Sequence, residues 1–257
     1  FMLGLNATPE AIENLRSELG INQNLPLRYF NWLSGLLTGD FGISYTYKVP
    51  VRDLILARMT VSIPLSIYSI LLTIGISFPA GIIAATYHRK PADYGIMGLS
   101  QFGISIPNFW FAMILVLLFS ISLGWFPAGG FSGWQRGVFY GLSSLTLPAL
   151  ALALPQAAIL IRIIRASLIE TLKADYIRTA RAKGLTHHQA ILRHGLKNAM
   201  IPILTILGLQ FSFLLAGAII IENVFFLPGL GRLIFQGIIQ RDLIVVESVV
   251  IILVFTI

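Results

Sequence analysis

The stretch "VSIPLSIYSILLTIGISFPAGIIAAT" (residues 61–86) contains no Asp, Glu, Lys or Arg. The uncharged run is longer still, because it extends from Arg58 to Arg89. A helix of about 20 apolar residues is enough to cross a hydrocarbon core of about 30 Å. This stretch therefore predicts a membrane span.

Further uncharged runs of this kind follow along the chain. They predict spans near 100–123, 142–161 and 201–221, and a fifth that begins near Val245. The whole chain is 56% hydrophobic and 11% charged, whereas soluble domains have about 25% charged residues. We therefore exclude a water-soluble globule and predict an all-α integral membrane protein, a polytopic helical bundle.

We expect both ends of the sequence to be incomplete. Phe1 is not an initiator residue, and "FMLGLN" is too short to be a span or a signal peptide. One span before Phe1 and more residues after Ile257 would give about six spans in the full chain. The chain has no cysteine, so it has no disulfide and no cysteine metal site.

The distribution of Lys and Arg predicts the orientation in the membrane. The loop over 162–198 carries most of the excess, with Arg162, Arg165, Lys173, Arg178, Arg181, Lys183, Arg193 and Lys197. Residues 1–60 balance their basic residues with acidic ones. Cytoplasmic loops are enriched in Lys and Arg. We therefore place 162–198 in the cytoplasm and 1–60 outside a cytoplasmic membrane, and no nucleic acid is needed to explain the net charge of +7.

The sequence divides into an external helical segment, 1–60, and a transmembrane domain, 61–257. "TPEAIENLRSELG" (8–20) has a Thr N-cap, a Pro at the first helical position and a terminal Gly, which predict a helix. A second short helix is predicted over 25–37. Prolines within or at the ends of spans indicate packing kinks or bends that shape a pathway; these are Pro64, Pro79, Pro107, Pro148, Pro155 and Pro202.

Several kinds of chemistry are missing from the sequence. No phosphate-binding loop with a Lys followed by Ser or Thr is present, and "PGLGR" (228–232) is interpreted as a turn or re-entrant structure. No charged residue lies in the middle of a span, which argues against an ion-coupled carrier and for energy delivered by another subunit. The histidines, His88, His187, His188 and His194, are interpreted as a solvated basic surface, and no catalytic, cofactor or metal site is predicted.

The segment 165–198 is a basic helical hairpin. Apolar residues recur three and four positions apart from Arg165 to Lys183, which predicts a single helix with one apolar stripe. Gly184 then stands where a helix ends in the left-handed conformation. Thr186 and Gln189 form the capping-box pattern T-x-x-Q at the start of a second helix.

Three functions compete for this hairpin. The first is a loop attracted to anionic lipid headgroups. The second is a helix pair that binds DNA, and the third is a docking element for a groove on a cytoplasmic partner. Attachment to spans at both ends argues against DNA. The residues alone leave the lipid-bound loop and the docking element open.

Several blocks of the chain resemble one family of membrane proteins. The blocks are "GDFGIS" (39–44), "SIPNFW" (105–110), "RASLIETLKADYIRTARAKGL" (165–185) and "ENVFFLPGLGRL" (222–233). Together they are similar to the dipeptide/oligopeptide/nickel permeases of bacterial ABC importers. The hairpin is similar to the coupling loop of such permeases, in which Gly184 matches the glycine and Ala180 the second alanine. Arg178 and Thr179 stand where the general pattern has Glu and Ala.

The resemblance implies a non-catalytic permease subunit in a bacterial cytoplasmic membrane, without a cofactor. Its partners would be a second homologous permease, two cytoplasmic ABC ATPases, an external solute-binding protein and membrane lipid. The ATPase-coupling residues would be Asp175, Tyr176, Arg178, Thr179, Ala180, Ala182, Gly184, Leu185, Thr186 and Gln189. Peptides are the first expected substrate, and nickel, nickel chelates or glutathione are alternatives. A membrane-anchored scaffold or signalling protein that recruits a cytoplasmic partner is the alternative of another class.

Overall fold

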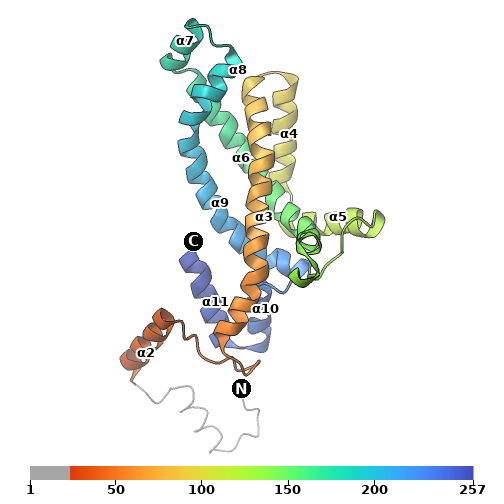
Figure 1. Ribbon diagram of the computed structural model, residues 1–257, viewed down its shortest axis with the longest axis vertical. Helices are drawn as coiled ribbons and strands as arrows, with labels where there is room; N and C mark the ends of the chain where they lie inside the picture. Colours follow the sequence, from red (N-terminus) through yellow and green to blue (C-terminus); the bar gives the residue numbers. More distant parts are fainter. Residues whose placement is uncertain (1–23, 257) are drawn as a thin grey trace, which may run out of the picture.

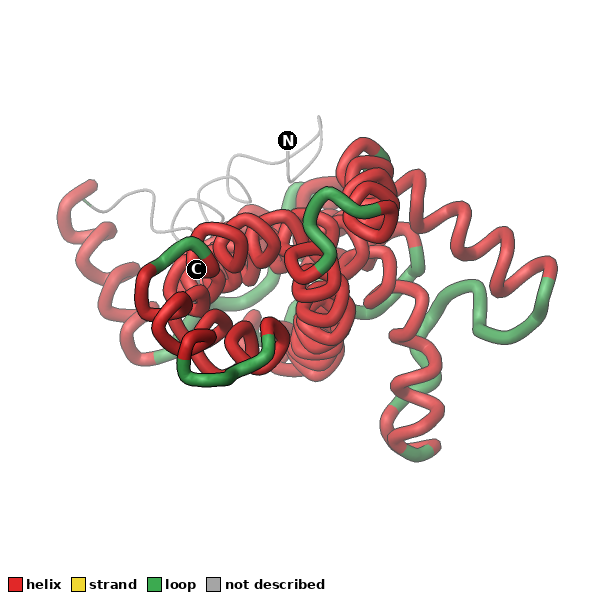
Figure 2. The backbone as a smooth tube through the Cα atoms, turned by 90° about the horizontal axis from the view of Figure 1, so that it is seen from above, coloured by secondary structure: helices red, strands yellow, loops and turns green. Residues whose placement is uncertain are grey.

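The computed structural model describes residues 24–256, which form helices and loops but no strand (Figures 1 and 2). This confirms the predicted all-α class. The helices are α2 (Leu25–Thr38), α3 (Val51–Thr86), α4 (Pro91–Ser105), α5 (Asn108–Leu115), α6 (Val138–Leu172), α7 (Asp175–Ala182), α8 (His187–Ala190), α9 (Leu196–Val224), α10 (Leu230–Gln240) and α11 (Leu243–Thr256). π-Helical turns cover Val116–Ser122 and Ile191–Gly195, and a 3-10 turn covers Trp134–Arg136.

Three helices in the described part of the chain are individually long and apolar enough to cross a membrane. They are α3, α6 and the helix Arg193–Val224, which contains α9. They correspond to the predicted spans near 61–86, 142–161 and 201–221, although each helix extends beyond the predicted bounds. α11 is a shorter apolar helix, at the position predicted for the start of a fifth span.

The segment predicted as a span near 100–123 is apolar as expected but is sharply bent. α4 and α5, with the π-helical turn that follows, form a pair bent by 104°. Pro107 causes the break, because a residue before proline avoids the helical conformation, and Ile106 is extended with φ −89° and ψ 126°. In Figure 1, α5 points away from the long axis along which α3, α4 and α6 run.

α3 and α6 approach each other through small residues. A row of small polar residues on α3 is buried at spacings of three and four, and it comprises Ser62, Ser66, Ser69, Thr73 and Ser77, followed by Gly81. The hydroxyl of Thr73 donates to the backbone oxygen of Ser69 at 2.9 Å and lies 3.3 Å from that of Ala153 on α6. Small residues let helix backbones come close, which is how helices associate in lipid.

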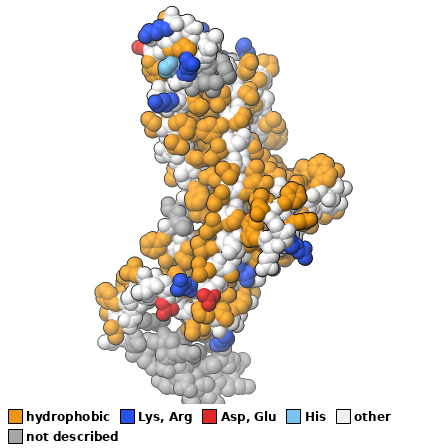
Figure 3. Space-filling model, viewed as in Figure 1, with side chains coloured by type: hydrophobic (Ala, Val, Ile, Leu, Met, Phe, Trp, Pro, Cys, Tyr) orange, Lys and Arg blue, Asp and Glu red, His pale blue; other side chains and the backbone are white. Residues whose placement is uncertain are grey.

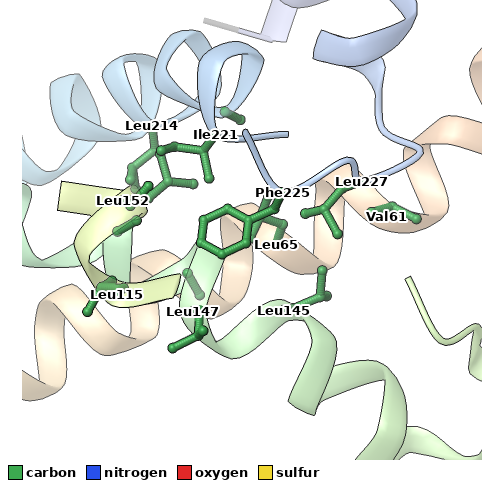
Figure 4. Close-up of a cluster of buried hydrophobic side chains, with 14 residues drawn as sticks. Val61, Leu65, Leu115, Leu145, Leu147, Leu152, Leu214, Ile221, Phe225 and Leu227 are labelled. Atoms are coloured by element: carbon green, nitrogen blue, oxygen red, sulfur yellow. The ribbon is translucent and has the colours of Figure 1, made fainter. Parts of the chain in front are cut away.

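Three clusters of buried apolar side chains follow the length of the bundle. The central cluster joins α3, α5, α6 and α9 around Leu65, Leu152, Leu214 and Phe225 (Figure 4). A second cluster lies near α7 and α8, and a third joins the start of α3 to α10 and α11. Many other large apolar side chains are exposed on the outer face of the bundle (Figure 3), as expected for a surface in contact with lipid or with another membrane subunit.

The helix predicted over 8–20 lies outside the described residues. The helix predicted over 25–37 is observed as α2, and it ends at Gly39, whose φ of 79° places it in the left-handed region. Its backbone N–H donates to the carbonyl of Leu36 at 3.2 Å, which closes the last turn of the helix.

Replacing Gly81 with Ala tests the contact between α3 and α6. A Cβ atom at Gly81 would lie 2.7 Å from Cβ of Ile164 on α6, whereas one at Gly75, on the same helix, meets nothing within 4 Å. We expect G81A to destabilise the protein by about 1–3 kcal/mol through overpacking. We expect G75A to stabilise it by up to about 1 kcal/mol, because Ala favours the helix. Thermal unfolding in detergent measures both, and equal effects would contradict the close packing at Gly81.

Candidate functional site

The hairpin 165–198, which contains α7 and α8, lies at the same end of the bundle as the turn between α3 and α4 (Figure 1). On the face shown in Figure 3, hydrophobic side chains fill the middle of the molecule, and charged side chains gather at its two ends. We call these the hairpin end and, at the opposite side, the α10 end. This distribution is the one expected of a protein whose middle lies in hydrocarbon.

The first half of the hairpin consists of two helices, which corrects the single helix predicted from Arg165 to Lys183. α6 continues to Leu172, and α7 starts again at Asp175. Between them Ala174 is extended, with φ −69° and ψ 145°. An Asp at the first position of α7 favours a new helix start there, because its charge faces the positive end of the helix dipole. The apolar stripe survives the break, since Leu168 and Ile177 are both buried.

The junction between α7 and α8 forms as predicted. Gly184 has a φ of 96°, in the left-handed region. The backbone N–H of Gln189 donates to Oγ1 of Thr186 at 3.3 Å, and the N–H of Thr186 donates to Oε1 of Gln189 at 3.0 Å. This reciprocal pair satisfies two backbone donors that the helix itself cannot satisfy. The capping box therefore fixes where the second half of the hairpin begins.

The second half of the hairpin continues into α9 without a break. α8 passes into the π-helical turn Ile191–Gly195, and Gly195 and Leu196 both keep helical backbone angles. Ile191 is buried against Leu168, so the two halves of the hairpin pack on each other at their base. The hairpin is therefore a structured extension of α6 and α9.

Most residues of the predicted coupling set lie on the exposed surface of the hairpin. These are Asp175, Tyr176, Arg178, Thr179, Ala182, Gly184, Thr186 and Gln189, whereas Leu185 is half-buried and Ala180 is buried. Arg178 reaches Asp175 at 3.5 Å, one turn earlier on α7. Both side chains are largely exposed, so this pair contributes about 0.5 kcal/mol or less.

A buried ionic cluster beside the hairpin was not predicted. Asp93 in the first turn of α4 is only 1% exposed, and Arg165 of α6 binds it with two hydrogen bonds, Nε to Oδ1 at 2.5 Å and Nη2 to Oδ2 at 2.7 Å. Nδ1 of His88 lies 3.2 Å from Oδ2 of Asp93 and 3.0 Å from Nη2 of Arg165. His88 remains 37% exposed, in agreement with its interpretation as part of a solvated surface, but its contacts with Asp93 and Arg165 were not predicted. The cluster ties the α3–α4 turn to α6.

The α10 end holds a second buried carboxylate, that of Glu222 at the end of α9. It is 0% exposed. The hydroxyl of Ser62 donates to Oε1 at 2.5 Å, and the N–H groups of Gly231 and Arg232 donate to Oε2 at 2.7 and 3.2 Å. The carboxylate therefore caps the N-terminus of α10, where negative charge is favoured.

The glycines of "PGLGR" leave room for this carboxylate. A Cβ atom at Gly229 would lie 2.2 Å from Cδ of Glu222, and one at Gly231 would lie 2.3 Å from Cα of Ile219. The interpretation of this segment as a turn holds only for its first two residues, because Gly229 is the N-cap of α10 and Leu230, Gly231 and Arg232 form its first turn. The sequence contains a Glu followed by two closely spaced glycines. That pattern alone did not predict the contact between the Glu222 carboxylate and the N-terminus of α10.

Asp242 lies in the turn between α10 and α11. Its carboxylate contacts the segment just before α3. Its Oδ2 accepts hydrogen bonds from Oγ of Ser44 at 2.5 Å and from the N–H of Thr46 at 3.0 Å. Burial works to raise the pKa of the Asp242 carboxyl, but hydrogen bonds from Ser44, Thr46 and Val245 outweigh it, and the pKa lies below its ordinary value. The carboxyl is therefore held as a charged acceptor.

A cavity of about 270 Å³ lies between α3, α9, α10 and α11. Its lining is mainly apolar, with Phe211, Leu215 and Leu253 among its walls. Its polar side chains are already hydrogen-bonded, Ser62 and Glu222 to each other and to α10, and Ser66 to the backbone oxygen of Ser62. The cavity therefore offers no free polar group in the described residues that line it.

Replacing Asp93 with Asn tests the ionic cluster. D93N leaves the guanidinium of Arg165 without its charged partner in a largely buried site, so we expect a loss of about 3 kcal/mol in the free energy of unfolding. The same change at Asp175, which breaks the exposed pair with Arg178, is expected to cost about 0.5 kcal/mol or less. Thermal unfolding of the purified protein measures both. Equal losses would show that the cluster does not hold the α3–α4 turn.

Two family descriptions match the sequence. Residues 77–257 match the family described as the inner membrane component of binding-protein-dependent transport systems. Residues 1–66 match the N-terminal part of the membrane component of such systems. Together these matches include the hairpin and nearly the whole of the described bundle.

Curated relatives are similar over most of their length. A peptide transport system permease of Brucella suis biovar 1 is 40% identical over 98% of this chain and 80% of the relative. The glutathione transport system permease protein GsiC of Shigella boydii serotype 4 is 42% identical over 95% of this chain and 78% of the relative. The GsiC protein of Escherichia coli strain K12 is 40% identical over the same shares.

Solved structures share the fold. The inward-facing MetNI methionine ABC transporter aligns with a TM-score of 0.65 at 16% identity, over 79% of this chain and 89% of the solved chain. An amino acid ABC transporter solved with histidines aligns with a TM-score of 0.59 at 18% identity, over 79% of this chain and 87% of the other. The bundle, the family matches and the relatives agree with the resemblance found in the sequence blocks. The chain therefore belongs to the membrane-embedded permease components of binding-protein-dependent ABC importers, in the dipeptide and oligopeptide family.

Proposed function

We propose that this protein forms half of the translocation pathway of an ATP-driven peptide importer and that the hairpin 165–198 transmits the action of a cytoplasmic ATPase. The observation that carries the proposal is the construction of the hairpin. Ile177, Ala180 and Ile191 are buried, the junction is fixed by a capping box, and most of the predicted coupling residues remain exposed. A helical element that is rigid and exposed is suited to a groove on a partner.

The orientation follows from charge. Lys and Arg residues are concentrated in 162–198, next to the ends of two long apolar helices. Basic residues close to the ends of spans favour the cytoplasmic side. The hairpin end would therefore face the cytoplasm, and the α10 end with segment 1–60 would face outward, where a solute-binding protein delivers its ligand.

A second permease and a pair of ABC ATPases would complete the importer. The chain has no phosphate-binding loop of its own, so ATP would be bound and hydrolysed by partner subunits, and this chain would be non-catalytic. Many apolar side chains of α3, α4, α5 and α9 are exposed, and a second membrane subunit would cover part of that surface.

Peptides are the proposed substrate class. The relatives described above carry names that refer to peptide and glutathione transport, and glutathione is itself a small peptide. No relative described here is named for nickel, so nickel stays an alternative that rests on the sequence blocks alone. The scaffold alternative has no support of this kind.

Cysteine crosslinking tests the proposed docking surface. The chain has no native cysteine, so T186C and Q189C each supply a single thiol on the exposed side of the α8 capping box. We expect both to crosslink to an ATPase subunit in membranes that contain the complete complex. The yield should change with bound nucleotide, because nucleotide closes the ATPase pair and moves its groove.

The control is Q135C, an exposed position in the 3-10 turn between α5 and α6, away from the hairpin. It should give no crosslink to the ATPase in any nucleotide state. A complete complex without a crosslink at any position across 175–195 would contradict docking through the hairpin.

Uptake into proteoliposomes tests the substrate. The complex is reconstituted with its binding protein, and ATP-dependent accumulation of labelled trialanine is measured. We expect uptake that requires ATP and the binding protein, and competition by excess unlabelled peptide. ATP-dependent uptake of Ni²⁺ without uptake of trialanine or glutathione would overturn the peptide proposal and leave the importer proposal intact.

A further inference from the structure

A groove of about 460 Å³ lies at the α10 end of the bundle, where the start of α3 lies beside α10 (Figure 1). Its lining includes α3 from Asp53 to Val61, together with Phe131 and Pro228 from the loops that follow α5 and α9. This part of α3 precedes or just enters the uncharged run that starts after Arg58. In the orientation proposed above, the groove is therefore on the outer side, where a solute is delivered.

Two opposite charges line this groove, the carboxylate of Asp53 and the guanidinium of Arg58. Asp53 is exposed and Arg58 is half-buried. Neither side chain forms a hydrogen bond or an ion pair with another described residue. Arg58 is attracted to the carboxylate of Glu222, but that carboxylate is already hydrogen-bonded to Ser62 and to the backbone of α10. Both charged groups therefore keep their hydrogen-bonding capacity for a ligand.

The side chains around the two charges are mostly apolar. Leu54, Val61 and Phe131 are buried or half-buried in the lining, and Ala57 lies between the two charged residues in the sequence of α3. Apolar walls accept side chains of many kinds, whereas a few charged groups fix the orientation of a ligand. The groove combines both properties.

The spacing of the two charges matches the length of a short peptide. Asp53 and Arg58 are five residues apart in α3, which corresponds to about 7.5 Å along the helix axis. An extended chain rises about 3.3–3.6 Å per residue, so two or three residues span about 7–11 Å. The ammonium and the carboxylate of a short peptide are thus separated on the same scale as these two side chains.

We propose that this groove binds the two charged ends of a short peptide, with the peptide ammonium at Asp53 and the peptide carboxylate at Arg58. This inference rests on the peptide-importer function proposed above and names the feature of the substrate that is recognised. The charged ends are the groups that all unmodified peptides share, whereas their side chains differ. A guanidinium matches the geometry of a carboxylate. Because the groove contributes one charge of each sign, it favours a zwitterion over a solute with a single charge.

Binding in this groove is weak. Neither charge is fully buried, and charge contacts that are accessible to water contribute little. Weak binding suits a step through which a solute has to pass, because a tightly held solute leaves slowly. The groove is therefore a place where the peptide is received and aligned, and its occupancy requires excess peptide in an experiment.

Protection of a cysteine tests the groove. The chain has no native cysteine, and A57C places a single thiol at an exposed position of the lining. A water-soluble thiol reagent should label it in the purified complete complex without the binding protein. Excess trialanine should slow the labelling by about twofold or more, as expected when at least half of the grooves are occupied. Trialanine with an acetylated N-terminus and an amidated C-terminus should not slow it. The control Q135C is exposed outside the groove, and its labelling should not respond to either peptide.

Variants without charge show which end of the peptide binds where. In the A57C background, D53N and R58Q should each raise the trialanine concentration needed for protection by about threefold to fivefold, the scale of one exposed charge contact. Acetylation of the peptide should have the same effect when Asp53 is present and no further effect in D53N, because the contact is already lost. Amidation should behave in this way with R58Q. The control R52Q removes an exposed charge next to Asp53 that does not line the groove, and it should leave protection unchanged.

Three results would overturn the groove as a peptide site. The first is an A57C thiol that is not labelled in the complex, and the second is equal protection by trialanine and its doubly blocked form. The third is protection by the binding protein alone and not by trialanine, which would make the groove a docking site for that protein. Normal ATP-dependent trialanine uptake beside any of these results would leave the importer function intact, whereas absence of uptake in the unmodified complex would defeat that function itself.

Discussion

The close approach of α3 and α6 is the interaction on which the rest of the structure depends. In hydrocarbon an apolar side chain gains little by leaving lipid for another helix, so association relies on tight packing and satisfied polar groups. The row of Ser, Thr and Gly on α3 provides both, because its small side chains admit α6 and its hydroxyls are bonded to backbone oxygens or, for Ser62, to the carboxylate of Glu222. α6 then supports α4, α5 and α9, and so positions the hairpin at one end and the α10 turn at the other.

The polar groups of the bundle differ between its ends and its middle. At the hairpin end Asp93 is held by Arg165 and His88, and at the α10 end Glu222 is held by Ser62 and two backbone N–H groups. These buried carboxylates have their acceptors filled and join separate helices. In the middle, the oxygens of Gln156 and Gln210 are unfilled. The ends are therefore joined by paired carboxylates, whereas the middle is joined by helix packing and the central apolar cluster.

The sequence predicted the fold well where the signal was local. Uncharged runs located α3, α6 and α9, and the T-x-x-Q pattern placed the start of α8 correctly. Pro107 indicated a bend but not its size of 104°, and the break at Ala174 was missed, because hydrophobic periodicity measures which residues face inward and not whether the helix is continuous. The contacts of Asp93 and Glu222 join residues 72 and 160 positions apart. Such pairings depend on how helices pack, and neither composition nor spacing contains that information.

The two connections of the hairpin to the bundle are mechanically different. α8 runs through a π-helical turn into α9 as a continuous rod, whereas α7 is joined to α6 through the extended residue Ala174. The helical backbone is continuous at the first joint and interrupted at the second. One rod therefore links the tip, the level of Gln210 and the carboxylate of Glu222, so that a single axial displacement would reach all three.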